Sequence, residues 1–138
     1  MCAVPRDHPL ILVANDDPVY LELMRKLLID AGYRALCLSI NVRAYEAVRV
    51  EKPDLVVLDI PVENLWGGWG LLELIRLDTK TMHIPMLLCS ANTQLIRDSM
   101  DRLRSLGCDV LQKPFNADQL LEKVGAAIGP PPSEKSVP

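Results

Sequence analysis

Short apolar runs alternate along the chain with longer segments in which apolar residues recur at helical intervals. Continuous apolar runs of strand length are typical of strands buried on both faces of a parallel sheet. These runs predict strands at residues 10–14, 34–38, 55–58, 86–89 and 110–112. A segment with helical spacing follows each predicted strand, and this alternation is typical of α/β domains.

The helical segments carry typical start and stop residues. Asp17 and Pro18 are suited to the N-cap and first turn of a helix, and Asn116 is a second typical N-cap. Glycine follows several of the segments, as it commonly does at a helix C-terminus. The predicted helices cover residues 18–31, 42–50, 71–77, 94–106 and 117–128. The stretch IPVENLWGGWG, at 60–70, is rich in Gly and Trp and predicts a loop.

The alternating strands and helices predict one α/β domain with a five-stranded parallel sheet covered by helices on both faces. We place this domain at residues 9–128, after an N-terminal extension at 1–8. Residues 129–138 are rich in Pro and Ser and predict a disordered tail or a truncated linker.

Composition and charge narrow the class of protein. The chain has 138 residues, of which 49% are hydrophobic and 24% charged, as in globular proteins. The net charge of −3 argues against direct nucleic-acid binding, which usually needs a basic domain. No apolar run is long enough to cross a membrane, and the N-terminus lacks the pattern of a signal peptide. The scattered cysteines contain no CxxC pair, so we expect reduced thiols in a cytoplasmic protein.

Polar residues stand where the apolar runs end. Functional sites of open parallel sheets lie at the carboxyl ends of the strands, so these residues are the candidates for a site. They are Asn15, Asp16 and Asp17 after the first strand, Asp59 after the third, Ser90 after the fourth and Lys113 after the fifth. Clustered carboxylates repel one another and are costly to desolvate, so either a positive group lies among them or water reaches them.

The residue types at this edge suit phosphoryl chemistry. Carboxylates with access to water suit Mg²⁺, which prefers oxygen ligands and keeps several waters. An aspartate beside Mg²⁺ can attack phosphorus and form an aspartyl phosphate. Lys113 and Ser90 could bind the oxygens of the transferred phosphoryl group.

The chain resembles the receiver domain of two-component response regulators over about residues 8 to 128. The resemblance rests on four motifs in the expected order: ILVANDDP with Pro18, DLVVLD at 54–59, IPMLLCSA at 84–91 and KPF at 113–115. It implies a doubly wound, flavodoxin-like sheet in the order 2-1-3-4-5. It also implies Mg²⁺-dependent phosphoryl transfer from a histidine kinase or a phosphotransfer protein, in a signalling switch rather than an ordinary enzyme.

The resemblance also implies a role for each matching residue. Asp59 matches the phosphoacceptor, Lys113 the family's lysine, and Ser90 the hydroxyl residue that engages the phosphoryl group. The Lys113–Pro114 bond is expected to be cis. The implied Mg²⁺ ligands are Asp16, Asp59, the backbone carbonyl of Pro61 and, through a water molecule, Asn15.

The chain departs from the family pattern near these residues. Asn15 replaces the first acid of the usual acidic pair, which should lower the affinity for Mg²⁺. Pro61, Glu63 and the late Gly68 make the loop after Asp59 atypical. Val110 replaces the usual switching aromatic residue and cannot swing as a tyrosine does. Trp66 and Trp69 are candidate anchors for a partner protein.

The sequence therefore predicts a phosphorylation-controlled switch that acts on an unidentified output partner. Three alternatives remain open. A degenerate receiver would work as a phosphorylation-independent interaction module. A flavin- or nucleotide-binding protein of flavodoxin-like fold would need backbone amides for an anion after the first strand, where Asp16 and Asp17 would repel it. A haloacid-dehalogenase-type phosphatase would need a second acid where Pro61 stands.

Overall fold

The computed structural model describes residues 8–40, 42–59, 65–91 and 93–129, with the backbone alone described at 42, 65–69 and 95. The predicted extension and tail therefore lie outside the described residues, except for His8 and Gly129. The strands are β1 (Leu10–Ala14), β2 (Arg34–Leu38), β3 (Leu55–Asp59), β4 (Met86–Ser90) and β5 (Cys108–Gln112). The helices are α1 (Pro18–Asp30), α2 (Val42–Glu51), α3 (Leu65–Leu77), α4 (Thr93–Ser105) and α5 (Ala117–Ile128).

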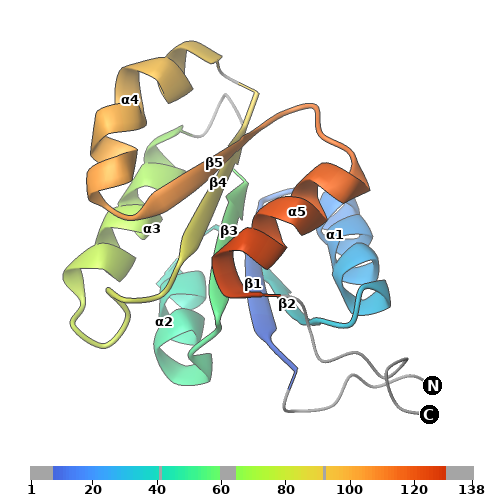
Figure 1. Cartoon of the computed structure of the whole chain (residues 1–138). Coiled ribbons are helices and arrows are strands. Elements are labelled where there is room, and N and C mark those ends of the chain that lie inside the picture. Colours follow the sequence, from blue (N-terminus) through green and yellow to red (C-terminus); the bar gives the residue numbers. More distant parts are fainter. Residues whose placement is uncertain (1–7, 41, 60–64, 92, 130–138) are drawn as a thin grey trace.

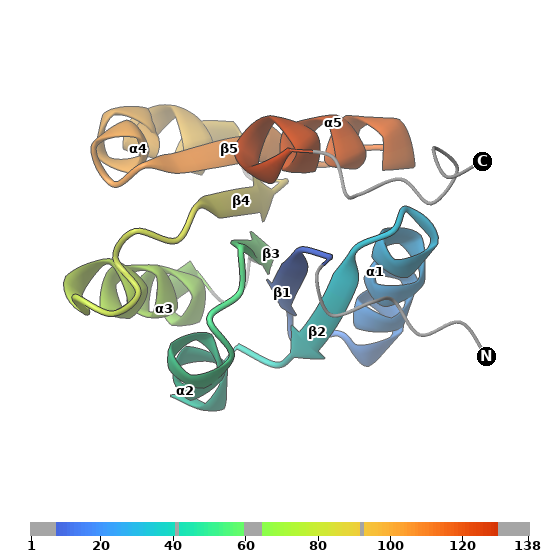
Figure 2. The same ribbon diagram turned by 60° about the horizontal axis from the view of Figure 1, so that its bottom comes forward.

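The five strands form one parallel sheet in the order β2-β1-β3-β4-β5, which confirms the predicted fold. Helices α1 and α5 cover one face of the sheet, and α2, α3 and α4 cover the other (Figures 1 and 2). Every residue of β1, β3 and β4 is buried, as expected for central strands between two helical layers. The fold is thus a three-layer α/β structure whose strands all point in one direction.

A separate hydrophobic core lies on each side of the sheet. On the α1 and α5 side, Met24 and Leu28 of α1 and Leu120 and Val124 of α5 pack against the strands. On the other side, the core includes Ala44 and Val48 of α2, Leu71, Leu72 and Ile75 of α3, and Leu103 of α4. The described helices include none long and apolar enough to cross a membrane.

The predicted caps of the first and last helices are confirmed. The Asp17 carboxylate accepts a hydrogen bond from the Val19 N–H at 2.9 Å, and Pro18 begins α1. Asn116 and Gln119 form a capping box at the start of α5. Such caps satisfy N–H groups that have no partner within the helix.

The predicted loop at 60–70 is wrong from Leu65 onward, because α3 begins there. Three glycines in this stretch favoured a loop, since glycine costs about 1 kcal/mol relative to alanine in a helix. Leu65, Trp69 and Leu72 nevertheless have helical spacing, and the helix buries Leu72 and Ile75 completely. Packing against the sheet therefore outweighs the low helix propensity of its first turns.

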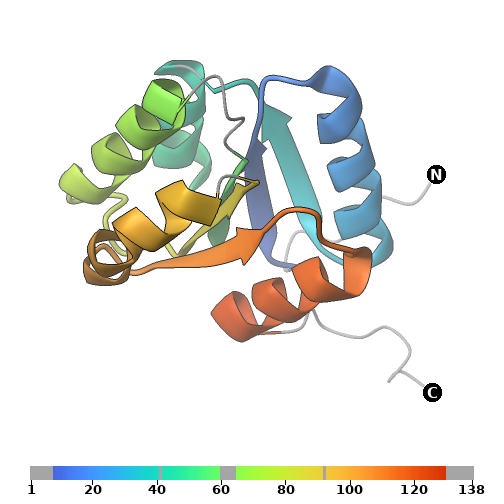
Figure 3. The same ribbon diagram turned by 90° about the horizontal axis from the view of Figure 1, so that it is seen from above.

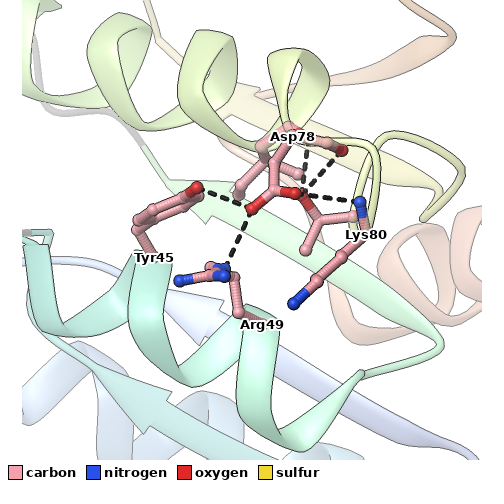
Figure 4. Close-up of polar contacts among 6 residues, drawn as sticks. Tyr45, Arg49, Asp78 and Lys80 are labelled. Atoms are coloured by element: carbon pink, nitrogen blue, oxygen red, sulfur yellow. Dashed lines mark hydrogen bonds and ion pairs between the residues drawn. The ribbon is translucent and has the colours of Figure 1, made fainter.

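Polar contacts join the C-terminal end of α3 to α2. The Tyr45 hydroxyl of α2 donates a hydrogen bond to the Asp78 carboxylate at 2.7 Å, and Arg49 pairs with the same carboxylate at 3.0 Å (Figure 4). The hydrogen bond from Tyr45 contributes most to holding the pKa of Asp78 below its usual range. Asp78 directly follows α3, so these contacts fasten α2 to the C-terminal end of that helix.

Candidate functional site

The parallel sheet brings the predicted site residues to one edge. Asn15 and Asp16 follow β1, Asp59 ends β3, and Ser90 ends β4. Lys113 follows β5, and its backbone N–H donates a hydrogen bond to the Ser90 carbonyl at 2.9 Å. Figure 3 looks from above onto this end of the sheet.

Asp59 is a completely buried carboxylate paired with one lysine. Its side chain is 0% exposed, and the Lys113 ammonium forms an ion pair with its Oδ1. The Lys113 side chain is 24% exposed, so the ammonium lies between the carboxylate and the surface. The Lys113–Pro114 bond is cis, as the resemblance implies. Beyond this ion pair, neither oxygen of Asp59 has a hydrogen-bond partner among the described residues.

The residues after β1 make a second set of contacts. The Asn15 side chain is buried, and its Nδ2 donates to the Asp59 carbonyl at 3.4 Å. Its Oδ1 accepts a hydrogen bond from the Asp17 N–H at 2.6 Å. Asp16 is exposed, and its Oδ1 accepts from the Ile40 N–H at 3.0 Å. The amide of Asn15 therefore joins the end of β1 to the phosphoacceptor candidate.

The donor atoms at this edge fit a hard cation such as Mg²⁺. The strongest indication is the buried Asp59 carboxylate, because a buried carboxylate normally has several partners. Apart from the ion pair with Lys113, its oxygens have no hydrogen bond of good geometry among the described residues. Asp16 supplies a carboxylate at the end of the neighbouring strand. In the described part of the chain, no group of three or more His, Cys, Asp or Glu side chains could hold a metal. A metal here would thus depend on two carboxylates together with backbone or amide oxygens and water.

Tyr20 of α1 also reaches this site, although it is not among the site residues predicted from the sequence. The Lys113 Nζ lies 5.0 Å from the centroid of the Tyr20 ring, in a cation–π contact. The Tyr20 hydroxyl is buried and has no hydrogen-bond partner of good geometry in the described structure. Burial raises the pKa of Tyr20, and the neighbouring Asp59 carboxylate raises it further. The signal that could have found it is its place in the first turn of α1, directly after the polar residues that follow β1.

Comparison with known proteins identifies the family. Residues 11–125 match the family model of the response regulator receiver domain. This chain belongs to that family. The receiver domain is therefore a signalling switch of two-component systems rather than a classical enzyme.

Relatives of this receiver domain agree with that assignment. It is 30% identical over 120 residues to the DNA-binding dual master transcriptional regulator RpaA of Synechocystis, covering 87% of this chain and 49% of RpaA. The chain thus spans about half the length of that relative. It is 31% identical to the N-terminal domain of a response regulator receiver protein from Methanoculleus marisnigri JR1, with a TM-score of 0.67, covering 87% of this chain and 96% of that one.

A further solved structure shares the fold. The receiver domain of the sensor histidine kinase PA1611 from Pseudomonas aeruginosa PAO1 has a TM-score of 0.72 at 23% identity, covering 88% of this chain and 98% of that one. That structure has a magnesium ion coordinated in its active site cleft.

Several predicted departures of this receiver domain lie outside the described structure. Pro61 and Glu63 lie outside it entirely, and at Trp66, Gly68 and Trp69 only the backbone is described. Val110 is described: it lies in β5, partly buried, and packs against the core on the α2, α3 and α4 side. A small, packed side chain thus occupies the position where the family usually has a switching aromatic residue.

Cys89 is a buried thiol next to the site. It pairs with Asp59 in the register of β3 and β4 and is completely buried. Burial, and then the charge of Asp59, raises the pKa of Cys89. The thiol therefore stays protonated at neutral pH, and we assign it to the core rather than to the chemistry.

Proposed function

We propose that this receiver domain accepts a phosphoryl group on Asp59 from a histidine kinase or a phosphotransfer protein. The observation that carries this proposal is the Asp59 carboxylate, which is completely buried at the end of β3 with Lys113 as its ion-pair partner. Burying a carboxylate with so few partners is costly, so its position is better explained by chemistry than by stability.

The proposed step is a displacement at phosphorus. A carboxylate oxygen of Asp59 forms a bond to phosphorus while the bond from phosphorus to the donor histidine nitrogen breaks. The imidazole leaves with the electron pair of that bond. The Lys113 ammonium, already against Asp59, is placed to bind a phosphoryl oxygen, and Ser90 offers a hydroxyl at the end of the adjacent strand.

Mg²⁺ is the cofactor that fits this donor set. We propose Asp16 and Asp59 as ligands, with the backbone carbonyl of Pro61 and a water molecule held by Asn15 completing the set. When bound, Mg²⁺ would offset the negative charge on the phosphoryl oxygens. The PA1611 receiver domain, which shares this fold and has a magnesium ion in its cleft, supports the assignment.

The surface of α1 is a candidate docking site for the phosphodonor. Leu23 is 63% exposed on this helix. Val19 is 69% exposed one helical turn earlier. Helix α1 begins at the edge that holds Asp16 and Asp59, so a protein bound to this apolar ridge could present a phosphohistidine to the acceptor.

The contacts of Asn15 favour one alternative, a receiver that works without phosphorylation. Its amide oxygen accepts from the Asp17 N–H, so it is already engaged where the family usually has an acid. A weaker metal site would slow phosphorylation. The fold would then serve as an interaction module for its output partner, with no contribution from the phosphoryl group.

The deciding experiment is intact-protein mass spectrometry after incubation with acetyl phosphate and Mg²⁺. We expect a single phosphoryl adduct on the wild-type chain. Asp59→Asn and a sample with excess chelator are the controls, and both should remain unmodified. A well-folded wild-type protein that gains no adduct would contradict the proposal and favour the phosphorylation-independent module.

A further inference from the structure

The Tyr20 side chain lies against the proposed phosphoacceptor but has no part in the chemistry described above. Its ring faces the Lys113 ammonium at 5.0 Å from Nζ to the centroid. Its buried hydroxyl lies beside the Asp59 carboxylate: burial is the main cause that raises the pKa of Tyr20, and the side-chain interaction with Asp59 is the next. Tyr20 therefore contacts both members of the ion pair from a third element, α1.

The buried polar atoms without hydrogen-bond partners gather at this point. In the described part of the chain, the buried side-chain atoms in this condition are Tyr20 Oη, Asp59 Oδ1 and Asp59 Oδ2. Tyr20 Oη is a donor, and the two Asp59 oxygens are acceptors, of which Oδ1 is paired with the Lys113 ammonium. A buried hydroxyl normally has a partner, so an unsatisfied donor beside a reactive carboxylate indicates a group that arrives later.

At a second site in the same chain, a tyrosine hydroxyl does have a hydrogen-bond partner of good geometry. Tyr45 also lies between a carboxylate and a cation, and Figure 4 shows its hydroxyl donating to Asp78. The Arg49 guanidinium is 5.9 Å from the Tyr45 ring centroid and pairs with Asp78. Each site contains a tyrosine, an aspartate and a basic side chain, which is Arg49 in one and Lys113 in the other. The hydroxyl at Asp78 has a hydrogen bond of good geometry, whereas the hydroxyl at Asp59 has none among the described residues.

We propose that the Tyr20 hydroxyl is a further phosphoryl-binding donor of this receiver domain, acting beside Lys113 and Ser90. This inference rests on the proposed function of Asp59. The hydroxyl donates a hydrogen bond to an oxygen of the phosphoryl group as that group bonds to Asp59. Because no hydrogen bond of good geometry joins this donor to the resting carboxylate, the hydrogen bond forms mainly during transfer and stabilises the transition state over the resting state. The ring supports the Lys113 ammonium in both states.

The test compares phosphorylation rates of Tyr20→Phe, Tyr45→Phe and the wild-type chain with acetyl phosphate and Mg²⁺. Tyr20→Phe keeps the ring that faces Lys113 and removes only the hydroxyl. We expect its rate constant to fall at least tenfold, because oxyanion donors of this kind contribute about a hundredfold or more. Tyr45→Phe removes a hydroxyl from the matched trio at the far end of the molecule and should keep the wild-type rate.

A spectroscopic measurement on the unaltered protein completes the test. The chain has three tyrosines, so ¹³Cζ-labelled tyrosine gives three resonances that can be assigned with the Phe variants. Phosphorylation should shift the Tyr20 resonance and leave those of Tyr33 and Tyr45 in place. An unchanged rate for Tyr20→Phe or an unshifted resonance on the phosphorylated protein overturns this inference while the proposed function stands. A wild-type chain that takes no phosphoryl group overturns both.

Discussion

Asp59 and Lys113 are more strongly coupled in this fold than an exposed ion pair would be. The carboxylate is 0% exposed, and Lys113 is the described residue that pairs with its charge. Removing one member of a buried ion pair leaves an uncompensated charge and usually costs about 3–5 kcal/mol. We therefore expect Lys113→Met to lower the free energy of unfolding by about that amount, as measured by urea denaturation at neutral pH.

A double-mutant cycle isolates the coupling from other effects of the substitution. In an Asp59→Asn background there is no buried charge to offset, so Lys113→Met should cost less than half as much. The difference between the two costs is the interaction energy of the pair. Equal costs in both backgrounds, within about 0.5 kcal/mol, would show that the methylene chain of Lys113 matters and its charge does not.

The sequence could predict which residues meet at the site, but not the hydrogen-bond and ion-pair partners of each side chain. Asp16, Asp59, Ser90 and Lys113 each follow or end an apolar strand, and parallel strands bring such residues to one edge. Their roles remain predictions. Tyr20 was missed because helical spacing shows only that a side chain lies on the inner face of α1. What its hydroxyl meets depends on how the helix packs against β3 and β5.

At the scale of elements, the wrong prediction for the start of α3 has a clear physical cause. Local propensity favours a loop wherever three glycines fall within four residues, as they do at 67–70. Helix α3 forms nonetheless because its later turns are buried against the sheet. These buried turns stabilise the helix, which continues toward its N-terminus through the glycines. The strands were predicted more accurately, since their apolar runs are the direct signal of burial on both faces.

Arg76 gives α3 a second role, as the element that fastens two turns at the opposite end of the sheet. Its guanidinium donates to the Met82 and Ile84 carbonyls at 3.0 and 2.6 Å, and to the Leu106 and Gly107 carbonyls. These carbonyls belong to the segments that lead into β4 and β5. Burial lowers the pKa of Arg76, but an arginine stays charged at any ordinary pH.

We expect Arg76→Met to destabilise the fold by at least about 2–3 kcal/mol, because hydrogen bonds to charged groups each contribute about 1.5–3 kcal/mol. Two of the four bonds, to the Ile84 and Leu106 carbonyls, are partly buried, and the other two are exposed. Arg76→Lys is the matched control, since it keeps the charge but cannot reach all four carbonyls. It should recover less than half of the loss. Urea denaturation gives both values. A loss below about 0.5 kcal/mol for Arg76→Met would show that water replaces the guanidinium without penalty.

At the scale of the whole molecule, one sheet separates two cores, and each core contains a buried cysteine. Cys89 lies in the core under α1 and α5, whereas Cys108 lies in the core under α2, α3 and α4. Burial raises the pKa of Cys89, and that of Cys108 to about 12. Both thiols are therefore protonated and shielded from reagents in the folded protein.

These two thiols report whether the helical layers open together. Because both cores share β1, β3 and β4, we expect a single cooperative unit in which neither layer leaves the sheet alone. In a chain with Cys2 and Cys37 replaced by serine, Cys89 and Cys108 should then react with a thiol reagent at the same rate. Both rates should rise equally with urea, and mass spectrometry of the digested protein measures them separately.

Faster labelling at one thiol would contradict this and identify a layer that opens by itself. Labelling of Cys108 ten times faster than Cys89 would assign the lower stability to the α2, α3 and α4 layer, at about 1.4 kcal/mol below global unfolding. Such an opening would also bear on signalling, because Val110 packs into that same core and replaces the aromatic side chain that usually moves. Val110 cannot move as that aromatic side chain does. A movement of the whole α2, α3 and α4 layer would then carry the signal from β5 to the surface of that layer.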